Sequence, residues 1–459
     1  MSTMRKIRIP FATCHPLLRP HARYRLTFAS PKLYPAPAMK IPCLLRPAAL
    51  LALALPLLAP AALRAQPPRG GGARGPGGGG ATTRSPEVGA DFRVTFRLAA
   101  AGAQAVNLLS DFSADTLPMT KGDNGVWTFT TEALKPGYYS YWFSVDGTLT
   151  PDPANTHVRP ASCVYKSMVD VPGPGTEWMD FRDVPHGTLH EHEYLNKENG
   201  TQRRVVIYTP PAYERSTASY PVLYLLHGRD DYERGWTQTG RAHLIMDNLL
   251  AEGKAVPAII VMPFIHDTTG ATGRQPSIRS LQSSLGITPA GRGAGGAPGA
   301  ARGPVGQGGG AAPAGATGGS YLERDILGNI QPLVESTYRV QKDKAHRALF
   351  GYSMGGSSAL SIGLSHPELY AYVGGFSFPF GVQNSPAFAS AEKTNADYKL
   401  IWLSSGTADN QGWQSSQNFH NQLTTLGIKH EWTASEGYHH DYQIWRIYLR
   451  DVLPKLFRE

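Results

Sequence analysis

A serine between glycines is the clearest sign of chemistry in this chain of 459 residues. Residues 351–355 are Gly-Tyr-Ser-Met-Gly and match Gly-x-Ser-x-Gly, a pattern that exposes a serine hydroxyl on a tight strand-to-helix turn. The match alone is weak evidence, because a chain with 50 Gly meets the pattern easily by chance. Its context strengthens it, since a strand is expected over 347–352 and a helix over 355–365. The sequence therefore predicts that Ser353 is a nucleophile for acyl transfer.

A serine hydroxyl is a poor nucleophile at neutral pH unless a base takes its proton, and an acid must orient that base. In folds with this turn, the acid and then the histidine follow the serine along the chain. Asp409, in a loop just after a predicted strand, fits the acid, and Glu436 is the alternative. His440 fits the base, and the adjacent His439 is its competitor. Asp441 is too close in sequence to His440 to orient its ring easily.

Two backbone N–H groups are expected to form the oxyanion hole. One belongs to Met354, where the following helix begins and adds positive potential. The other belongs to Arg229, which follows an apolar strand over 222–226 and the dipeptide 227–228. His227 precedes the serine along the chain, so it is not expected to be the base. The sequence contains no HExxH, no CxxC pair and no phosphate-cradling glycine loop, so neither a metal nor a nucleotide cofactor is indicated.

The elements that must position these residues alternate between strands and helices over 176–459, which predicts a mostly parallel sheet covered on both faces, the α/β hydrolase fold. The predicted strands cover 203–209, 222–226, 258–262, 347–352 and 399–404, and the predicted helices cover 242–252, 322–338, 355–365, 413–426 and 442–457. A Gly/Ala/Pro-rich insert over 268–320, with four Arg and no acidic residue, interrupts this pattern. We expect it to be a long, disordered surface loop.

Residues 1–65 are expected to be a leader, with Met39 as the initiator. A basic start, a short apolar run over 47–62 and a small residue at Ala65 are typical of a secretory signal peptide. The run is too short and too interrupted by proline for a membrane span, which needs about 20 apolar residues. We therefore expect cleavage near Ala65 and a secreted product, periplasmic or extracellular. A Gly/Pro-rich linker over 66–88 follows.

The net charge of +9 belongs to this leader, because residues 1–65 hold ten Lys and Arg and no acid, and removing them leaves −1. A nucleic-acid partner or an anionic membrane surface therefore loses its main support. The three cysteines are Cys14, Cys43 and Cys163, of which the first two leave with the leader. No disulfide can then form within the mature chain.

Residues 89–175 show a different pattern, in which short strands of period two are separated by turn signals. The predicted strands cover 94–98, 105–109, 126–131, 138–145 and 162–171. This spacing predicts a small β-sandwich. In the strand 138–145, alternate apolar residues are expected in the core, which leaves Tyr138 and Trp142 on the other face. They are expected to pack against the following domain, with sugar stacking as the alternative, and Trp127 is equally ambiguous.

The segment 180–459 resembles the family-one carbohydrate esterases, an esterase-D-like group that includes feruloyl and acetylxylan esterases. The residues that carry the resemblance are 224–228, Glu233, Trp236, 240–242, 247–249, 251–254, 353–356, 440–442, Trp445 and Arg446. The resemblance implies a triad of Ser353, Asp409 and His440. It also favours His440 over His439, because Asp or Thr and then an aromatic residue usually follow the closing histidine of that family.

Residues 89–172 resemble the immunoglobulin-like early-set module that is related to glycogen-binding domains and often precedes these esterases. The matching positions are 136–139, 145–147 and 152–153. Together the two resemblances imply a secreted serine carboxylic ester hydrolase that removes feruloyl or acetyl groups from plant polysaccharide. One alternative is a siderophore esterase that cleaves a catecholate trilactone. Another, from a different class, is a non-catalytic glycan-binding protein. The sequence makes no prediction of oligomeric state.

Overall fold

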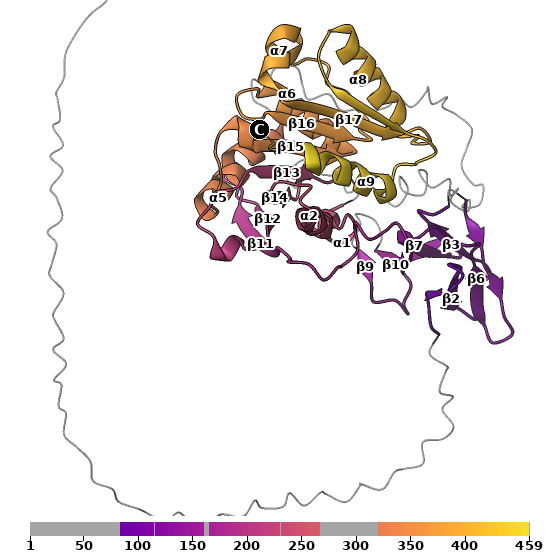
Figure 1. Ribbon diagram of the computed structural model, residues 1–459. Helices are drawn as coiled ribbons and strands as arrows, with labels where there is room; N and C mark the ends of the chain where they lie inside the picture. The colour runs from indigo at the N-terminus through magenta and orange to yellow at the C-terminus, as the bar shows by residue number, and fades with distance from the viewer. Residues whose placement is uncertain (1–82, 114, 160–164, 230, 267–319, 459) are drawn as a thin grey trace, which may run out of the picture. The chain divides into compact units, whose positions relative to one another are not determined.

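The α/β domain is built on one eight-stranded sheet, with the strand that leads to the serine in its interior (Figure 1). The structure is a computed structural model that describes residues 83–458 apart from 114, 160–164, 230 and 267–319. The described residues exclude the leader, most of the linker and Cys163. They also exclude residue 267 and the whole predicted insert except its last residue. All described residues belong to one compact unit, Pro76–Glu459.

The strand order is β11-β12-β14-β13-β15-β16-β17-β18. The pairs β11–β12 and β12–β14 are antiparallel, and the remaining five pairs are parallel. The strands are β11 (Thr188–Leu195), β12 (Gln202–Thr209), β13 (Val222–Leu226), β14 (Ile259–Pro263), β15 (Arg347–Tyr352), β16 (Tyr372–Phe376), β17 (Leu400–Gly406) and β18 (Glu431–Ser435). The carboxyl ends of the parallel strands therefore meet at one edge, where this class of sheet carries its site.

Helices cover both faces of the sheet, as the sequence predicts. One apolar core joins the sheet to α4 (Tyr321–Asp325), η2 (Ile326–Ile330), α5 (Gln331–Thr337), α6 (Met354–Ser365), α7 (Ala391–Asp397) and α8 (Trp413–Thr425). A second core joins the other face to α1 (Gly235–Gln238), α2 (Ala242–Ala251) and α9 (Tyr442–Val452). Strand β13 shows why two cores form, because Tyr224 contributes to the first and its neighbours Leu223 and Leu225 contribute to the second.

Two predicted helices differ from those observed. The helix expected over 322–338 contains a π-helical turn, η2, in which Asn329 donates to the Asp325 carboxylate and accepts from the Lys197 N–H. The helix expected over 442–457 ends at Val452, because Pro454 has no N–H group to continue the α-helical hydrogen bonds. A short 3-10 turn, η5 (Leu453–Lys455), takes over.

Three strands of the sheet were not predicted. Strand β11 lies at an edge and its side chains are half exposed or exposed, so it lacks an apolar run. The opposite edge strand, β18, also has only half-exposed or exposed side chains, so it too lacks an apolar run. Strand β16 is buried but contains Gly374 and Gly375, a residue type that strands usually avoid. A side chain at Gly375 would lie 2.7 Å from Leu360, so glycine lets α6 pack closely here.

The N-terminal part is a β-sandwich of two antiparallel sheets around its own core. One sheet contains β1 (Glu87–Val88), β2 (Val94–Ala99), β6 (Val126–Thr130) and β5 (Thr120–Lys121). The other contains β4 (Leu117–Pro118), β3 (Val106–Ser110), β7 (Gly137–Val145), β10 (Lys166–Val171), β9 (Val158–Arg159) and β8 (Thr148–Thr150). The predicted core residues Tyr139, Tyr141 and Phe143 lie in it.

The three ambiguous aromatic residues of the sandwich all have protein partners. The Tyr138 ring packs under the guanidinium of Arg241, with 4.0 Å to the ring centroid, which confirms packing against the α/β domain. Trp142 lies outside the sandwich core, as predicted, and is buried beneath the ammonium group of Lys166. Trp127 belongs to the sandwich core and donates to the Ala100 carbonyl.

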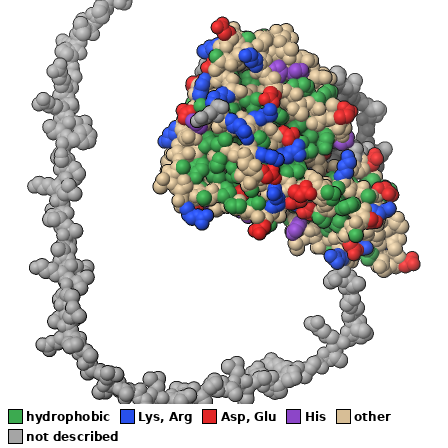
Figure 2. All heavy atoms as spheres, in the orientation of Figure 1, with side chains coloured by type: hydrophobic (Ala, Val, Ile, Leu, Met, Phe, Trp, Pro, Cys, Tyr) green, Lys and Arg blue, Asp and Glu red, His purple; other side chains and the backbone are tan. Residues whose placement is uncertain are grey.

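On the face of the molecule in Figure 2, Lys and Arg side chains lie among Asp and Glu side chains rather than in a field of one sign. Within the described part of the chain, none of the helices combines the length and apolar character that a membrane span requires.

Candidate active site

Ser353 occupies a strained turn between β15 and α6. Its backbone has φ 52° and ψ −127°, a conformation that L-residues with a side chain rarely adopt. The Ser353 N–H donates to the carbonyl oxygen of Phe376 at 2.8 Å, which ties the turn to the adjacent strand β16. Surrounding structure thus holds the strain and presents the hydroxyl beyond the carboxyl end of β15.

The glycines of the motif allow this turn to pack against the loop after β13. A Cβ atom on Gly355 would collide with the carbonyl oxygen of His227, and one on Gly351 would lie 2.6 Å from the Gly355 carbonyl. On the opposite side, a Cβ atom on Gly228 would lie 2.5 Å from the ring of Tyr352. The serine turn and the His227–Gly228 segment are therefore in direct contact.

The predicted acid, base and nucleophile form one hydrogen-bonded chain. The Nε2 of His440 lies 2.8 Å from the Oγ of Ser353. The Nδ1 of the same ring lies 3.0 and 2.9 Å from the two carboxylate oxygens of Asp409. These residues come from three separate loops at the same sheet edge, and the distances are those that proton transfer from serine to imidazole requires.

Asp409 is held as a carboxylate by its surroundings. Burial of this side chain disfavours its charge, but the His440 hydrogen bond and charge, together with the Gly412 N–H, outweigh burial and keep the pKa below its ordinary value. The Oδ1 atom also accepts from the N–H groups of Gln411 at 2.9 Å and Gly412 at 2.7 Å. A fixed carboxylate of this kind orients the imidazole and stabilises its protonated form.

The competing candidates lie elsewhere. His439 is exposed, and its Nδ1 contacts the carbonyl oxygen of Ala408 at 3.1 Å instead of Ser353. Glu436 is exposed. The Asp441 carboxylate caps helix α9 by accepting from the Gln443 N–H at 2.8 Å.

The two predicted oxyanion donors lie on the segments that meet at the serine turn. Met354 is the first residue of α6, where a helix provides no internal partner for its N–H groups. Arg229 directly follows Gly228, which packs on the serine turn.

His227 supports this loop. Burial lowers its pKa well below the ordinary value, and its neutral ring donates from Nδ1 to the Gly228 carbonyl at 2.7 Å and accepts from the Ile265 N–H at 3.2 Å.

Behind the triad lies a buried aromatic group that sequence reasoning did not assign to the site. Tyr352 stacks on Trp445 with ring centroids 3.9 Å apart, and the His440 ring meets Trp445 edge-on at 5.0 Å. Trp236 and Tyr442 complete the group. The only sequence signal for Trp236, Tyr442 and Trp445 was their place in the family resemblance.

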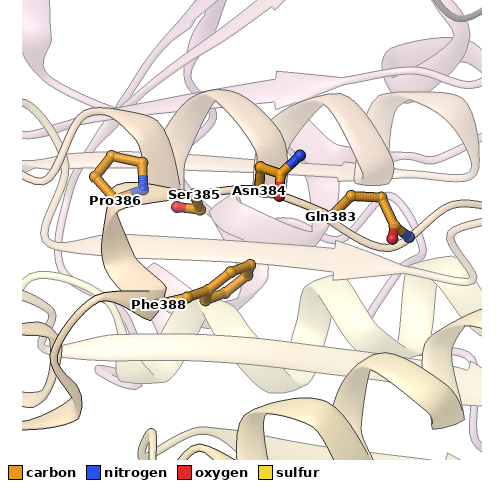
Figure 3. Close-up of a pocket in the computed structure, with 5 residues that line it drawn as sticks. All are labelled: Gln383, Asn384, Ser385, Pro386 and Phe388. Carbon is orange, nitrogen blue, oxygen red and sulfur yellow. The ribbon is translucent and has the colours of Figure 1, made fainter. Parts of the chain in front are cut away.

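A hollow of about 450 Å³ lies in the loop before α7 (Figure 3). The residues that line it are Gln383, Asn384, Ser385, Pro386 and Phe388. The Ser385 hydroxyl donates to the carbonyl of Leu364 near the end of α6 at 2.7 Å. Leu364 is about 16 Å along the helix from Ser353, at 1.5 Å per residue. This hollow is therefore not where the triad would meet its substrate.

Among the described residues, no cluster of three or more His, Cys, Asp or Glu is arranged to hold a metal ion.

Comparison with known proteins identifies two matched regions. The family model described as "Putative esterase" matches residues 197–273 and 301–456. The model for carbohydrate-binding module 48, the isoamylase N-terminal domain, matches residues 80–160. An endo-1,4-beta-xylanase/feruloyl esterase of Xylanibacter ruminicola is 28% identical over 348 residues, which are 74% of this chain. This chain spans only 41% of that relative's length.

Among solved structures, an enterobactin esterase shares the fold. The enterobactin esterase of Shigella flexneri, solved in the presence of 2,3-dihydroxy-N-benzoyl-serine, matches with a TM-score of 0.55 and 18% identity over 80% of this chain and 94% of its own. A CE1 ferulic acid esterase of Anaeromyces mucronatus matches with a TM-score of 0.46 and 22% identity over 62% and 96%. The predicted fold class, an α/β hydrolase domain preceded by a small all-β sandwich, is confirmed.

Proposed function

Because the chain belongs to the esterase family matched above, we propose that it is a carboxylic ester hydrolase that works through an acyl-enzyme on Ser353 and removes feruloyl or acetyl groups from plant polysaccharide. The observation that carries the mechanism is the unbroken hydrogen-bonded chain from the Ser353 hydroxyl through His440 to the Asp409 carboxylate. A strained serine whose hydroxyl faces an imidazole oriented by a buried carboxylate supports this role.

In this mechanism the Ser353 Oγ attacks the ester carbonyl carbon while His440 Nε2 takes the hydroxyl proton. The backbone N–H groups of Met354 and Arg229 hold the oxyanion. His440 then gives the proton to the departing alcohol, which leaves an acyl group on Ser353. Water, deprotonated by the same imidazole, attacks this second ester, and the proton returns to Ser353 as the acid leaves. Asp409 orients the imidazole and stabilises its charge throughout.

The acyl group and the glycan are proposed from the relatives. The Xylanibacter relative is named for both xylanase and feruloyl esterase activity, and residues 80–160 match a carbohydrate-binding module. Together these matches favour an ester on a polysaccharide. The siderophore alternative draws on the match to the enterobactin esterase. At 18% identity, that match shows a common fold and does not indicate a common substrate. We also propose export, from the signal-like leader cleaved near Ala65.

The test is hydrolysis of p-nitrophenyl acetate, methyl ferulate, acetylated xylan and a catecholate trilactone by the wild type and by Ser353→Ala. We expect the wild type to cleave methyl ferulate or acetylated xylan, and the variant to be at least about a thousandfold slower. Preference for the trilactone would instead establish the siderophore alternative. Equal inertness of both proteins on every ester would refute catalysis and leave glycan binding as the function. N-terminal sequencing of the exported protein tests cleavage near Ala65.

A further inference from the structure

A buried ion pair joins the β-sandwich to the loop behind the serine turn. Arg159, in strand β9 of the sandwich, places its Nη1 atom 3.2 Å from the Oδ2 atom of Asp231 in the α/β domain. The two side chains are only 11% and 5% exposed. Removing one partner of such a pair leaves an uncompensated charge out of water, which is strongly unfavourable. The sandwich therefore supplies the cation that the buried Asp231 carboxylate requires.

The same carboxylate oxygen holds two tyrosines that flank the triad in sequence. Oδ2 of Asp231 accepts from the hydroxyl of Tyr352 at 2.7 Å and from that of Tyr442 at 2.8 Å. Tyr352 directly precedes Ser353, and Tyr442 follows His440 by two residues. Burial, with the negative charge of Asp231, raises the pKa of both tyrosines well above its ordinary value, so both hydroxyls keep their protons.

A second set of contacts fixes the same region from the sandwich side. The carbonyl oxygen of Tyr138 accepts from Gln443 Nε2 at 2.9 Å and from Arg446 Nη2 at 2.8 Å. Gln443 and Arg446 lie in the first turns of α9, immediately after the loop that carries His440. The Arg159 guanidinium of β9 also lies 5.4 Å from the centroid of the Tyr442 ring. Strands β7 and β9 of the sandwich therefore both contact the segment that sets the position of the base.

We propose that Arg159 is a positioning residue for ester hydrolysis, supplied by the β-sandwich. By neutralising Asp231 it keeps one carboxylate between Tyr352 and Tyr442, and so fixes the backbone on both sides of the Ser353–His440 contact. The inference rests on the proposed serine mechanism, and it makes the sandwich part of the catalytic unit rather than only a tethered binding module. Arg159 does not touch the triad, so its effect must pass through Asp231 and the tyrosines.

The experiment compares the full-length wild type with Arg159→Met, using p-nitrophenyl acetate as the ester. This small substrate needs no contact with the sandwich. We expect kcat to fall tenfold or more with KM within twofold, because displacing reacting groups by about 1 Å can cost a hundredfold in rate. Arg159→Lys, which restores the charge without the planar guanidinium, is expected to recover part of kcat.

The matched control is Asp170→Asn. Asp170 also joins the sandwich to the α/β domain, through a 2.8 Å ion pair with Arg241, but its side chain is half exposed and contacts neither flanking tyrosine. We expect its kcat and KM to stay within twofold of the wild type. A general loosening of the two domains would slow both variants equally, which would overturn the positioning role.

The outcomes separate this inference from the proposed function. If folded Arg159→Met keeps kcat within twofold while Ser353→Ala is inactive, the positioning role is wrong and the serine mechanism stands. If Ser353→Ala is as active as the wild type, the proposed function itself fails. Should Arg159→Met not fold, Tyr442→Phe removes one of the two hydrogen bonds through which Arg159 is proposed to act and leaves both buried charges in place. A kcat within twofold of the wild type in that variant would overturn the inference, and a tenfold fall would support it.

Discussion

Both carboxylate oxygens of Asp409 lie within 3.0 Å of the Nδ1 atom of His440, and two backbone N–H groups point at the same carboxylate. This arrangement places the imidazole proton on Nδ1 and leaves Nε2 to accept from Ser353. In Asp409→Asn, the amide can donate to Nδ1 and favour the wrong tautomer. We expect kcat for p-nitrophenyl acetate to fall by about 10³ to 10⁴, with little change in unfolding temperature.

Two nearby variants serve as controls for this effect. His439 contacts a backbone carbonyl, and Glu436 is exposed, so His439→Gln and Glu436→Gln should keep kcat within about twofold. If Glu436→Gln were as slow as Asp409→Asn, the acid would be misassigned.

The close approach of Gly355 to the His227 carbonyl predicts that even one added methyl group is harmful. Gly355→Ala would force α6 away from the loop that carries Arg229, and overpacking of this kind costs about 1–3 kcal/mol. We expect a lower midpoint in urea unfolding and at least a tenfold loss of kcat. Gly328→Ala is the control, because a side chain there meets nothing within 4 Å. Equal stability of the two variants would contradict the argument.

The sequence predicted the parts of the site that are encoded locally. Ser353 lies in a short motif, and Asp409 and His440 follow it in the order that this type of turn demands. Arg159 and Asp231 carry no such signal, because neither lies in a motif or follows a fixed order along the chain, and only the fold brings their charges together.

Strand β16 was missed for a related reason. Gly374 disfavours a strand when judged alone, but a side chain there would lie 2.6 Å or less from the ring of Phe350, on the neighbouring strand. Packing between strands, which a single segment does not reveal, therefore overrides the local preference.

We expect the buried Asp441 carboxyl group to make the stability of the folded protein depend on pH. Burial, and then the charge of Asp111, raise its pKa to about 6. The folded state thus binds this proton more tightly than the unfolded state, and stability is lost as the pH rises from about 4 to 6. Above pH 6 the cost is on the order of 1–3 kcal/mol. An asparagine side chain keeps the helix-capping acceptor without the charge, so Asp441→Asn should be more stable than the wild type at pH 8 and similar at pH 4.

Urea unfolding of the wild type and Asp441→Asn at both pH values measures this difference. Asp441→Ala separates charge from capping, because it loses both and should fall below Asp441→Asn at either pH by about 1 kcal/mol. If Asp441→Asn exceeded the wild type in stability by the same amount at pH 4 and at pH 8, the Asp441 carboxyl group of the wild type would not titrate between these pH values.

The buried side chain of Arg203 contacts both of the described segments that flank residues 267–319. The guanidinium of Arg203 lies 5.1 Å from the ring of Phe264 and 5.2 Å from that of Tyr321, and it pairs with Asp325 at 3.3 Å. Since both ends meet at one side chain, replacing 268–318 by a short Gly-Ser linker should leave the unfolding temperature within a few degrees of the wild type. Arg203→Met should instead cost about 3–5 kcal/mol, because it strands the Asp325 charge. If the shortened protein is the less stable of the two, the segment contributes to the fold and the Arg203 contacts do not suffice to hold its ends.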